Sequence, residues 1–196
     1  MRSGLAVILT VLLPLIALAA APSPAGSVRG TIVAVGLKTN ADIVVSLEAP
    51  GLSVKPPAAP VKMDQKSLLF VPHILPIVRG TTVRFLNSDQ EPHNVYSPEG
   101  RYNLGTWPPG ETRDYTFAQP GIFTQLCRIH PDMLAFVVVL ETPYFTVTDK
   151  AGAFRIANVP AGSYTLVAWS EEYDFVERVI AVVAGRELSV DLAMGR

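Results

Sequence analysis

Cysteine is nearly absent from this sequence: the chain of 196 residues contains one, Cys127, alongside three histidines and four methionines. A single cysteine excludes a disulfide within the chain. A free thiol in an oxidising compartment is a liability unless it is buried or bound to something. Burial alone is the ordinary explanation for such a residue, so the neighbours of Cys127 must decide its role.

Excess charge is absent too. The formal net charge is -1, and 49% of the residues are hydrophobic, which argues against disorder and against a nucleic-acid-binding surface. No amphipathic helix is evident after the N-terminal segment. What is present is 14 glycines and 17 prolines between Val-rich stretches, a mixture typical of short strands joined by turns. The sequence therefore predicts an all-β protein.

The first 19 residues have the features of a signal peptide. A short basic start is followed by the apolar run Leu5 to Leu18, and Ala17-Leu18-Ala19 places small residues where a signal peptidase cleaves. The run of roughly 14 residues is shorter than the roughly 20 that a spanning helix needs, although an uncleaved membrane anchor is the alternative. We expect export to the periplasm, with no membrane span once residues 1–19 are removed.

Strand patterns alternate with turns along the rest of the chain. Val28 to Val33 and Ile43 to Leu47 are predicted strands, and the Pro-rich stretch from Pro50 to Pro60 is a predicted linker. Further strands are expected between Leu68 and Leu140, with a loop from Arg101 to Gly110. Short strands follow Tyr144. Two β-sandwiches are the expected architecture.

The residues that carry chemistry cluster in one short segment. Cys127, His130 and Met133 lie within seven residues, where one predicted strand ends and the next begins, and His93 follows another predicted strand. Two imidazoles, one thiolate and a long axial thioether form the ligand set of a blue (type 1) copper site. The sequence thus predicts one copper ion on His93, Cys127, His130 and Met133.

Alternatives exist for each of these residues. A Cys-x-x-His pair arises by chance, Met133 alone would belong to a core, and His93 alone would be a turn residue. Zinc also binds Cys and His, but structural zinc sites usually have four Cys and His ligands in pairs, and a second Cys is missing here. The combination favours copper.

These residues belong to a stretch, residues 61 to 140, that resembles the cupredoxins, nearest to the amicyanins and plastocyanins. The resemblance covers under half of the chain, and the short ending His130-Pro131-x-Met133 favours amicyanin. The matching segments are Gly80-Thr81-Thr82-Val83, Phe85-Leu86-Asn87, Pro92-His93-Asn94-Val95, Tyr115-Thr116-Phe117, Pro120-Gly121-Ile122-Phe123, Cys127-x-x-His130-Pro131-x-Met133 and Val137-Val138-Val139.

The resemblance implies a Greek-key sandwich over residues 61–142, with copper near one end beneath a partly exposed His130. It also implies that Asn94 supports the ligands by tying the His93 turn to the Cys127 loop, as hydrogen bonds around metal ligands commonly do. An ordinary turn residue is the alternative for Asn94. His73, the remaining histidine, is expected to be a solvated loop residue.

Tyr144 to Met194 is similar to the carboxypeptidase regulatory-like (transthyretin-like) β-sandwiches, with Asp149 and Gly152 fitting a hairpin turn. Such a module lacks its opening strands when it starts there. We therefore expect a discontinuous second sandwich from residues 27–50 and 143–194, with the cupredoxin inserted. It is expected to be a rigid spacer or a partner-binding platform, with Trp169 packed and the Glu171-Glu172 turn solvated.

The predicted function is single-electron transfer between redox partners rather than enzyme catalysis. The resemblance to amicyanin suggests an amine dehydrogenase as donor, and a c-type cytochrome would be an acceptor. Docking is expected on apolar surface around Pro92, His130, Pro131 and Leu134. Copper handling without redox cycling is the alternative, although Met-rich or His-rich tracts are missing. Multicopper oxidase chemistry is disfavoured because no His-x-His pair occurs.

Overall fold

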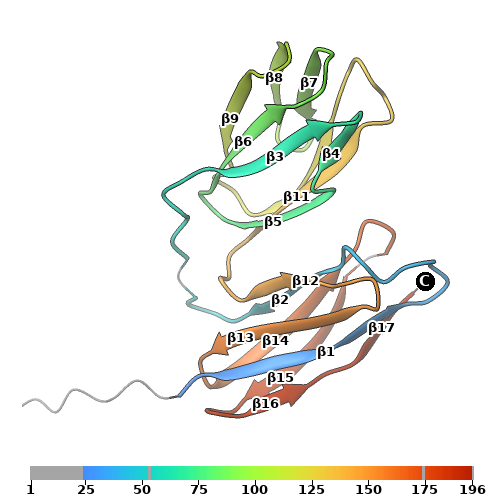
Figure 1. Ribbon diagram of the computed structural model, residues 1–196. Coiled ribbons are helices and arrows are strands. Elements are labelled where there is room, and N and C mark those ends of the chain that lie inside the picture. The colour runs from blue at the N-terminus through green and yellow to red at the C-terminus, as the bar shows by residue number, and fades with distance from the viewer. Residues whose placement is uncertain (1–23, 53, 174, 196) are drawn as a thin grey trace, which may run out of the picture.

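Every regular element in the described part of the chain is a β-strand. The computed structural model describes residues 24–52, 54–173 and 175–195, so the predicted signal peptide, residues 1–19, lies outside the described residues. In those ranges there is no helix of the length and apolar character needed to cross a membrane. The expected all-β class is confirmed: strands form two sandwiches, one above the other in Figure 1.

The upper sandwich consists of strands β3 to β11. Their bounds are β3 Val61–Lys66, β4 Leu69–Val71, β5 Ile74–Val78, β6 Thr82–Asn87, β7 His93–Ser97, β8 Tyr102–Trp107, β9 Thr112–Thr116, β10 Gly121–Leu126 and β11 Leu134–Leu140. One sheet has the order β4-β3-β6-β9 and the other β5-β11-β10-β7-β8. Neighbours that are not consecutive in sequence, such as the parallel pair β5 and β11, arise because the chain crosses repeatedly between the two sheets.

The lower sandwich combines the two ends of the described chain. Its strands are β1 Gly26–Ala34, β2 Val44–Glu48, β12 Phe145–Val147, β13 Ala153–Val159, β14 Gly162–Trp169, β15 Val176–Val182, β16 Glu187–Ser189 and β17 Leu192–Met194. One sheet has the order β13-β1-β16, with β17 also pairing with β1, and the other has the order β12-β2-β14-β15. The colours of Figure 1 show this mixture of blue and orange strands below the green ones.

These pairings suit an inserted arrangement. β1 pairs with β13, β16 and β17, and β2 pairs with β12 and β14, all more than 90 residues later in the chain. The chain leaves the lower sandwich after β2 and returns to it at β12. We therefore propose two domains, with residues 61–142 inserted between residues 27–50 and 143–194.

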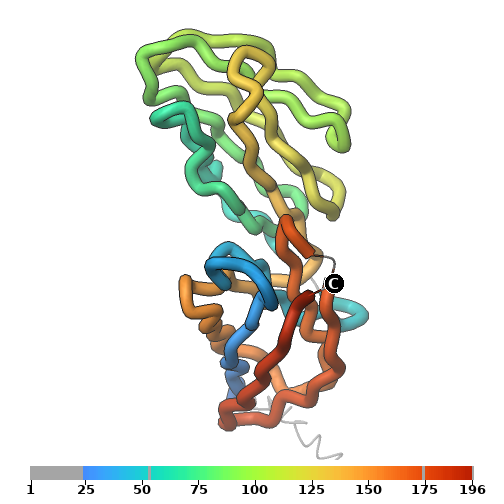
Figure 2. The backbone as a smooth tube through the Cα atoms, turned by 90° about the vertical axis from the view of Figure 1, so that its right-hand side faces the viewer, coloured from blue at the N-terminus to red at the C-terminus, as the bar shows by residue number. Residues whose placement is uncertain are grey.

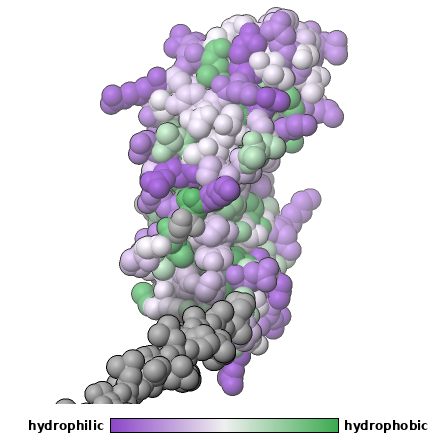
Figure 3. All heavy atoms as spheres, turned by 90° about the vertical axis from the view of Figure 1, so that its left-hand side faces the viewer, coloured by the Kyte–Doolittle hydropathy of each residue, from purple (hydrophilic) through white to green (hydrophobic). Residues whose placement is uncertain are grey.

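Each sandwich encloses its own hydrophobic core, because strand residues alternate between a buried and an exposed face. In β6 the buried residues are Val83, Phe85 and Asn87. A third cluster lies between the sandwiches, where Val44 and Trp169 of the lower one meet Ile74 and Val138 of the upper one. Figure 2 shows the two sandwiches stacked along the long axis. In Figure 3, hydrophobic residues occur near the junction of the sandwiches, and hydrophilic residues cover much of the upper end.

Two local expectations are wrong. The segment from Arg101 to Gly110 is not all loop, because β8 pairs with β7 there, with Tyr102 opposite Ser97. Gly105, at φ 79°, interrupts the alternation of apolar and polar residues that would have revealed the strand. The turn at Asp149 and Gly152 is not a hairpin, since it joins β12 and β13 of opposite sheets. Gly152 is required there, because a Cβ atom would lie 2.1 Å from the carbonyl oxygen of Ile32.

Candidate metal centre

Three strand ends of the upper sandwich bring the predicted ligands together. His93 is the first residue of β7, and Cys127 directly follows β10. β7 and β10 are neighbours, with Tyr96 opposite Leu126, so their adjoining residues meet at the same end of the sheet. His130 lies in the loop between Cys127 and β11. His93 and Cys127 are far apart in sequence but lie side by side, because β7 begins and β10 ends at this edge of the sheet.

His93, Cys127 and His130 form a compact group of possible metal ligands. Their ligand atoms all lie within 4.8 Å of one another. The two Nδ1 atoms are 3.0 Å apart, and His130 Nδ1 lies 3.9 Å from Cys127 Sγ. His93 is fully buried, Cys127 is buried, and the His130 side chain keeps 22% of its surface exposed. The group therefore sits just beneath the surface, and His130 is the member that reaches solvent.

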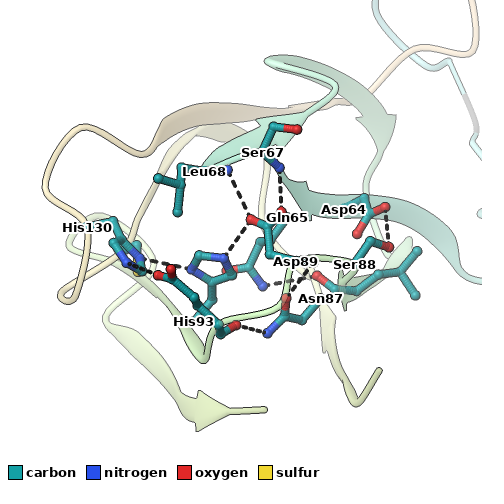
Figure 4. Close-up of polar contacts among 12 residues, drawn as sticks. Asp64, Gln65, Ser67, Leu68, Asn87, Ser88, Asp89, His93 and His130 are labelled. Carbon is teal, nitrogen blue, oxygen red and sulfur yellow. Dashed lines mark hydrogen bonds and ion pairs between the residues drawn. The ribbon is translucent and has the colours of Figure 1, made fainter. Parts of the chain in front are cut away.

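A carboxylate that the sequence analysis did not identify orients His93. Asp89 Oδ2 lies 2.8 Å from His93 Nε2, and Asp89 also accepts hydrogen bonds from the backbone N–H groups of Ser67 and Leu68 (Figure 4). Burial raises the pKa of Asp89, but the hydrogen bonds from Leu68, His93 and Ser67 outweigh it and hold that pKa below its usual value. When the carboxylate accepts a hydrogen bond from Nε2–H, Nδ1 keeps its lone pair and is the nitrogen that lies in the group with His130 and Cys127.

His130 has a similar but more exposed partner. Its Nε2 atom lies 3.3 Å from Glu91 Oε2, and 64% of the Glu91 side chain is exposed. Asp89 and Glu91 both belong to the turn that precedes His93, and Asn87 braces this turn by donating a hydrogen bond to the Glu91 carbonyl. Asp89 and Glu91 precede His93 by four and two residues. This closeness in sequence is the signal that could have pointed to them.

Asn94 is hydrogen-bonded to the Cys127 loop through both its backbone and its side chain. Its backbone N–H donates to Cys127 Sγ at 3.4 Å, and its Oδ1 accepts from the Arg128 N–H at 3.4 Å. Its Nδ2 donates to Asn103 Oδ1 and the Gly105 carbonyl, both at 2.8 Å. These bonds fix the Cys127 sulfur and the start of its loop relative to the His93 turn.

Met133 closes the loop on its inner side. Its backbone N–H donates to the His130 carbonyl at 3.0 Å, and its side chain is fully buried in the core cluster that contains Cys127. A thioether in this position is a soft donor held inside the sandwich. The structure thus gathers His93, Cys127 and His130 as a group and places Met133 in the core beside them.

His73 lies in the loop between β4 and β5 with its side chain 39% exposed, but unlike a simple solvated histidine it has two bonding partners. Its Nδ1 lies 3.1 Å from the Leu134 carbonyl oxygen, and its Nε2 contacts Glu171 of the lower sandwich. Glu171 and Glu172 are exposed between β14 and β15, as expected, although the Glu171 carboxylate also contacts His73. Residues 98 positions apart in sequence gave no local signal of this contact.

Both parts of the chain are similar to known proteins. The similar solved structures include a cupredoxin, an amicyanin and a nitrite reductase. One is a purple cupredoxin from Nitrosopumilus maritimus, at 24% identity over 41% of this chain and 99% of that one, with a TM-score of 0.38. Another is a reduced amicyanin variant, at 20% identity over 49% of this chain and 98% of that one, with a TM-score of 0.41.

A copper-containing nitrite reductase from Thermus scotoductus is also similar, at 28% identity and a TM-score of 0.41. The match covers 48% of this chain but only 25% of that enzyme. A family model for the carboxypeptidase regulatory-like domain matches residues 134–195, about a third of the chain. The matched residues run from β11 of the upper sandwich to the end of β17 in the lower one.

Proposed function

We propose that this protein is an exported copper protein that transfers single electrons. It would hold one type 1 copper ion with His93 Nδ1, Cys127 Sγ, His130 Nδ1 and the Met133 thioether. The observation that carries this proposal is that two imidazole nitrogens and one thiol sulfur lie together beneath the surface. The Nε2 atom of each of these two histidines lies beside a carboxylate. This donor set fits copper, since soft sulfur suits Cu(I) and imidazole suits Cu(II).

The bound ion would supply the one-electron change between Cu(I) and Cu(II). The residues of the chain supply a site that barely moves during that change. His93 is fixed by Asp89, and Cys127 is fixed by the Asn94 N–H, both inside a packed core. Ligands held in this way need little rearrangement when the charge of the metal changes, which suits electron transfer better than metal release.

The face around His130 is the proposed docking site for redox partners. The His130 edge is partly exposed, and the side chain of Ile129 beside it is 46% exposed. Leu68 and Leu69, in the turn whose backbone binds Asp89, are also exposed apolar residues. A small apolar surface around an exposed ligand edge allows a partner to approach closely, and a net charge of -1 provides little electrostatic steering.

We propose a periplasmic location after removal of residues 1–19, and redox enzymes or c-type cytochromes as partners, including an amine dehydrogenase. We propose a carrier and not an enzyme, because with Met133 as the fourth ligand the copper would have a closed set of four protein ligands. A closed set leaves no position for a substrate on the metal.

A visible spectrum of the exported, copper-loaded protein tests this function. We expect an intense band near about 600 nm from copper–thiolate charge transfer, bleached by ascorbate and restored by an oxidant. A protein that binds copper without colour would instead support copper handling. A protein that binds no copper would contradict both functions.

A further inference from the structure

His73 lies where the two sandwiches meet. It is also close to the end of the loop from Cys127 to Met133, called the metal loop below. It precedes β5, which begins at Ile74, and its imidazole has partners on both sides. Nδ1 lies 3.1 Å from the carbonyl oxygen of Leu134, and Nε2 contacts the Glu171 carboxylate. Leu134 directly follows Met133, so the imidazole joins the lower sandwich to the residue beside a predicted ligand.

The His73 side chain extends the pairing of β5 and β11 toward the metal loop. The parallel ladder of these strands starts with Phe136 opposite Ile74, and the Phe136 N–H donates to the His73 carbonyl at 2.9 Å. The Leu134 carbonyl lies before the start of this ladder, and it is bonded by the His73 side chain and not by the backbone of β5. Both partners are hydrogen-bond acceptors, so an imidazole that bonds both donates from Nδ1 to the Leu134 carbonyl and from Nε2 to the Glu171 carboxylate.

Aromatic packing holds the same corner. The Phe136 ring lies between the His73 ring, at 5.9 Å, and the Trp169 ring, at 5.5 Å, both edge to face. Trp169 ends β14 and Glu171 follows two residues later, so one strand end of the lower sandwich delivers both contacts. The side chains of His73 and Glu171 are 39% and 30% exposed, which leaves them substitutable without opening a core.

We propose that Glu171 and His73 are positioning residues through which the lower sandwich fixes the Met133 end of the metal loop. The carboxylate holds the imidazole, the imidazole holds the Leu134 carbonyl, and Leu134 sets where β11 begins. The second sandwich is then a support of the metal site and not a spacer. Its consequence for copper rests on the proposed function, because the length of a weak axial contact is among the features that tune a type 1 site.

The same strand pair supplies a matched control at its opposite end. Arg79 follows β5 and Glu141 follows β11, and their side chains form an ion pair at 3.1 Å. Glu171→Ala and Glu141→Ala each remove one carboxylate beside the β5–β11 pair. Only the first removes it beside the metal loop. Glu171→Gln keeps an amide that can bond His73, so it serves as the conservative variant.

The first readout is amide hydrogen exchange in the metal-free protein, which does not depend on copper. We expect Glu171→Ala to accelerate exchange at the Met133 and Phe136 amides by about tenfold, as lost local bonds ease opening. Glu141→Ala should leave both amides unchanged, and Glu171→Gln should restore most of the protection. Equal exchange in Glu171→Ala and the unsubstituted protein would overturn the proposal.

The second readout is the reduction potential and the ratio of visible bands in the copper-loaded protein. Glu171→Ala should change the one-electron equilibrium with a reference couple by about threefold or more, with Glu141→Ala unchanged and Glu171→Gln close to the original. A shift shared by both Ala variants would indicate lost charge and not positioning, and would overturn the role at the metal. If the unsubstituted protein shows no blue band, the proposed function fails, and the exchange readout still decides whether the contact fixes the loop.

Discussion

The two sandwiches differ in what they bury. The lower core consists of apolar side chains such as Ile32, Leu47 and Leu166, and the buried polar residues that the structure describes in that sandwich carry only small hydroxyl groups: Ser27, Ser46, Thr148 and Ser170. The upper sandwich buries His93, Asn94, Asn87, Gln65 and Gln125 in addition to its apolar core. A buried polar group costs free energy unless it is bonded. His93, Asn94 and Asn87 are bonded around the candidate metal centre. The upper sandwich is thus organised around a site and the lower one around packing.

The difference also shows how one core can support another. The third hydrophobic cluster and the His73–Glu171 contact connect the sandwiches beside β11, the strand that leaves the metal loop. A sandwich whose interior serves packing can therefore contribute rigidity to a neighbouring site. The following predictions separate these contributions.

The largest expected effect is loss of the chromophore from the upper sandwich. Cys127→Ser removes the thiolate, and we expect complete loss of the absorption near about 600 nm. The serine is close in size, so the far-ultraviolet circular dichroism of the variant should be unchanged. Retention of the blue band would show that Cys127 is not a ligand.

A core substitution in the lower sandwich should destabilise the protein without changing its chemistry. Leu166 is fully buried, and Leu166→Ala should lower the free energy of unfolding by about 3 kcal/mol through lost contacts and a cavity. Chemical denaturation followed by fluorescence measures this change. At temperatures where the variant stays folded, its visible spectrum should match the original; a bleached folded variant would show that the two cores are not separable.

A smaller effect is expected from the carboxylate beside His93. Asp89→Asn keeps the shape but removes a negative charge that lies 2.8 Å from Nε2 and favours the more positive Cu(II) form. The reduction potential should rise by about 60 mV, equal to a tenfold change in a one-electron equilibrium. Glu91→Gln should cause a smaller rise, because Glu91 is far more exposed and solvent screens its charge. Voltammetry measures the reduction potential of both variants. A larger rise for Glu91→Gln than for Asp89→Asn would contradict this prediction.

The smallest effect concerns an exposed ion pair outside the site. Arg84 donates two hydrogen bonds to Asp114, at 2.8 and 2.7 Å, which lowers the pKa of that carboxyl despite some burial. A lowered pKa stabilises the fold above the usual carboxyl range, and the contribution is lost as pH falls through the folded-state value. Asp114→Asn should therefore lower Tm by about one or two degrees at pH 7.

This difference in Tm should begin to shrink as pH falls below about 4, and it should vanish below the lowered folded-state pKa, where Asp114 is uncharged like its Asn replacement. Thermal melts across pH measure it. Glu187→Gln is the counterpart in the lower sandwich, where hydrogen bonding from Arg155 likewise lowers the carboxyl pKa. A constant difference at all pH values would show that the charge of Asp114 is not the cause.

Much of the fold could be predicted because the relevant signals are local. The alternation of Val83 and Phe85 with polar neighbours predicted β6, and the spacing of Cys127, His130 and Met133 predicted a metal loop between two strands. β8 could not be predicted, since Gly105 breaks the alternation and the pairing with β7 decides the conformation.

By itself, the sequence determined which donor atoms are available and that three of the four lie within one short loop. It also determined the β class, through the two-residue period of its strands. Only the tertiary structure decided that Asp89 faces His93, that Glu91 faces His130, and that Glu171 of one sandwich meets His73 of the other. Periodicity reports which face of a strand is buried, whereas these contacts depend on how strands pair and sandwiches stack, and that is fixed by the packing of the whole chain.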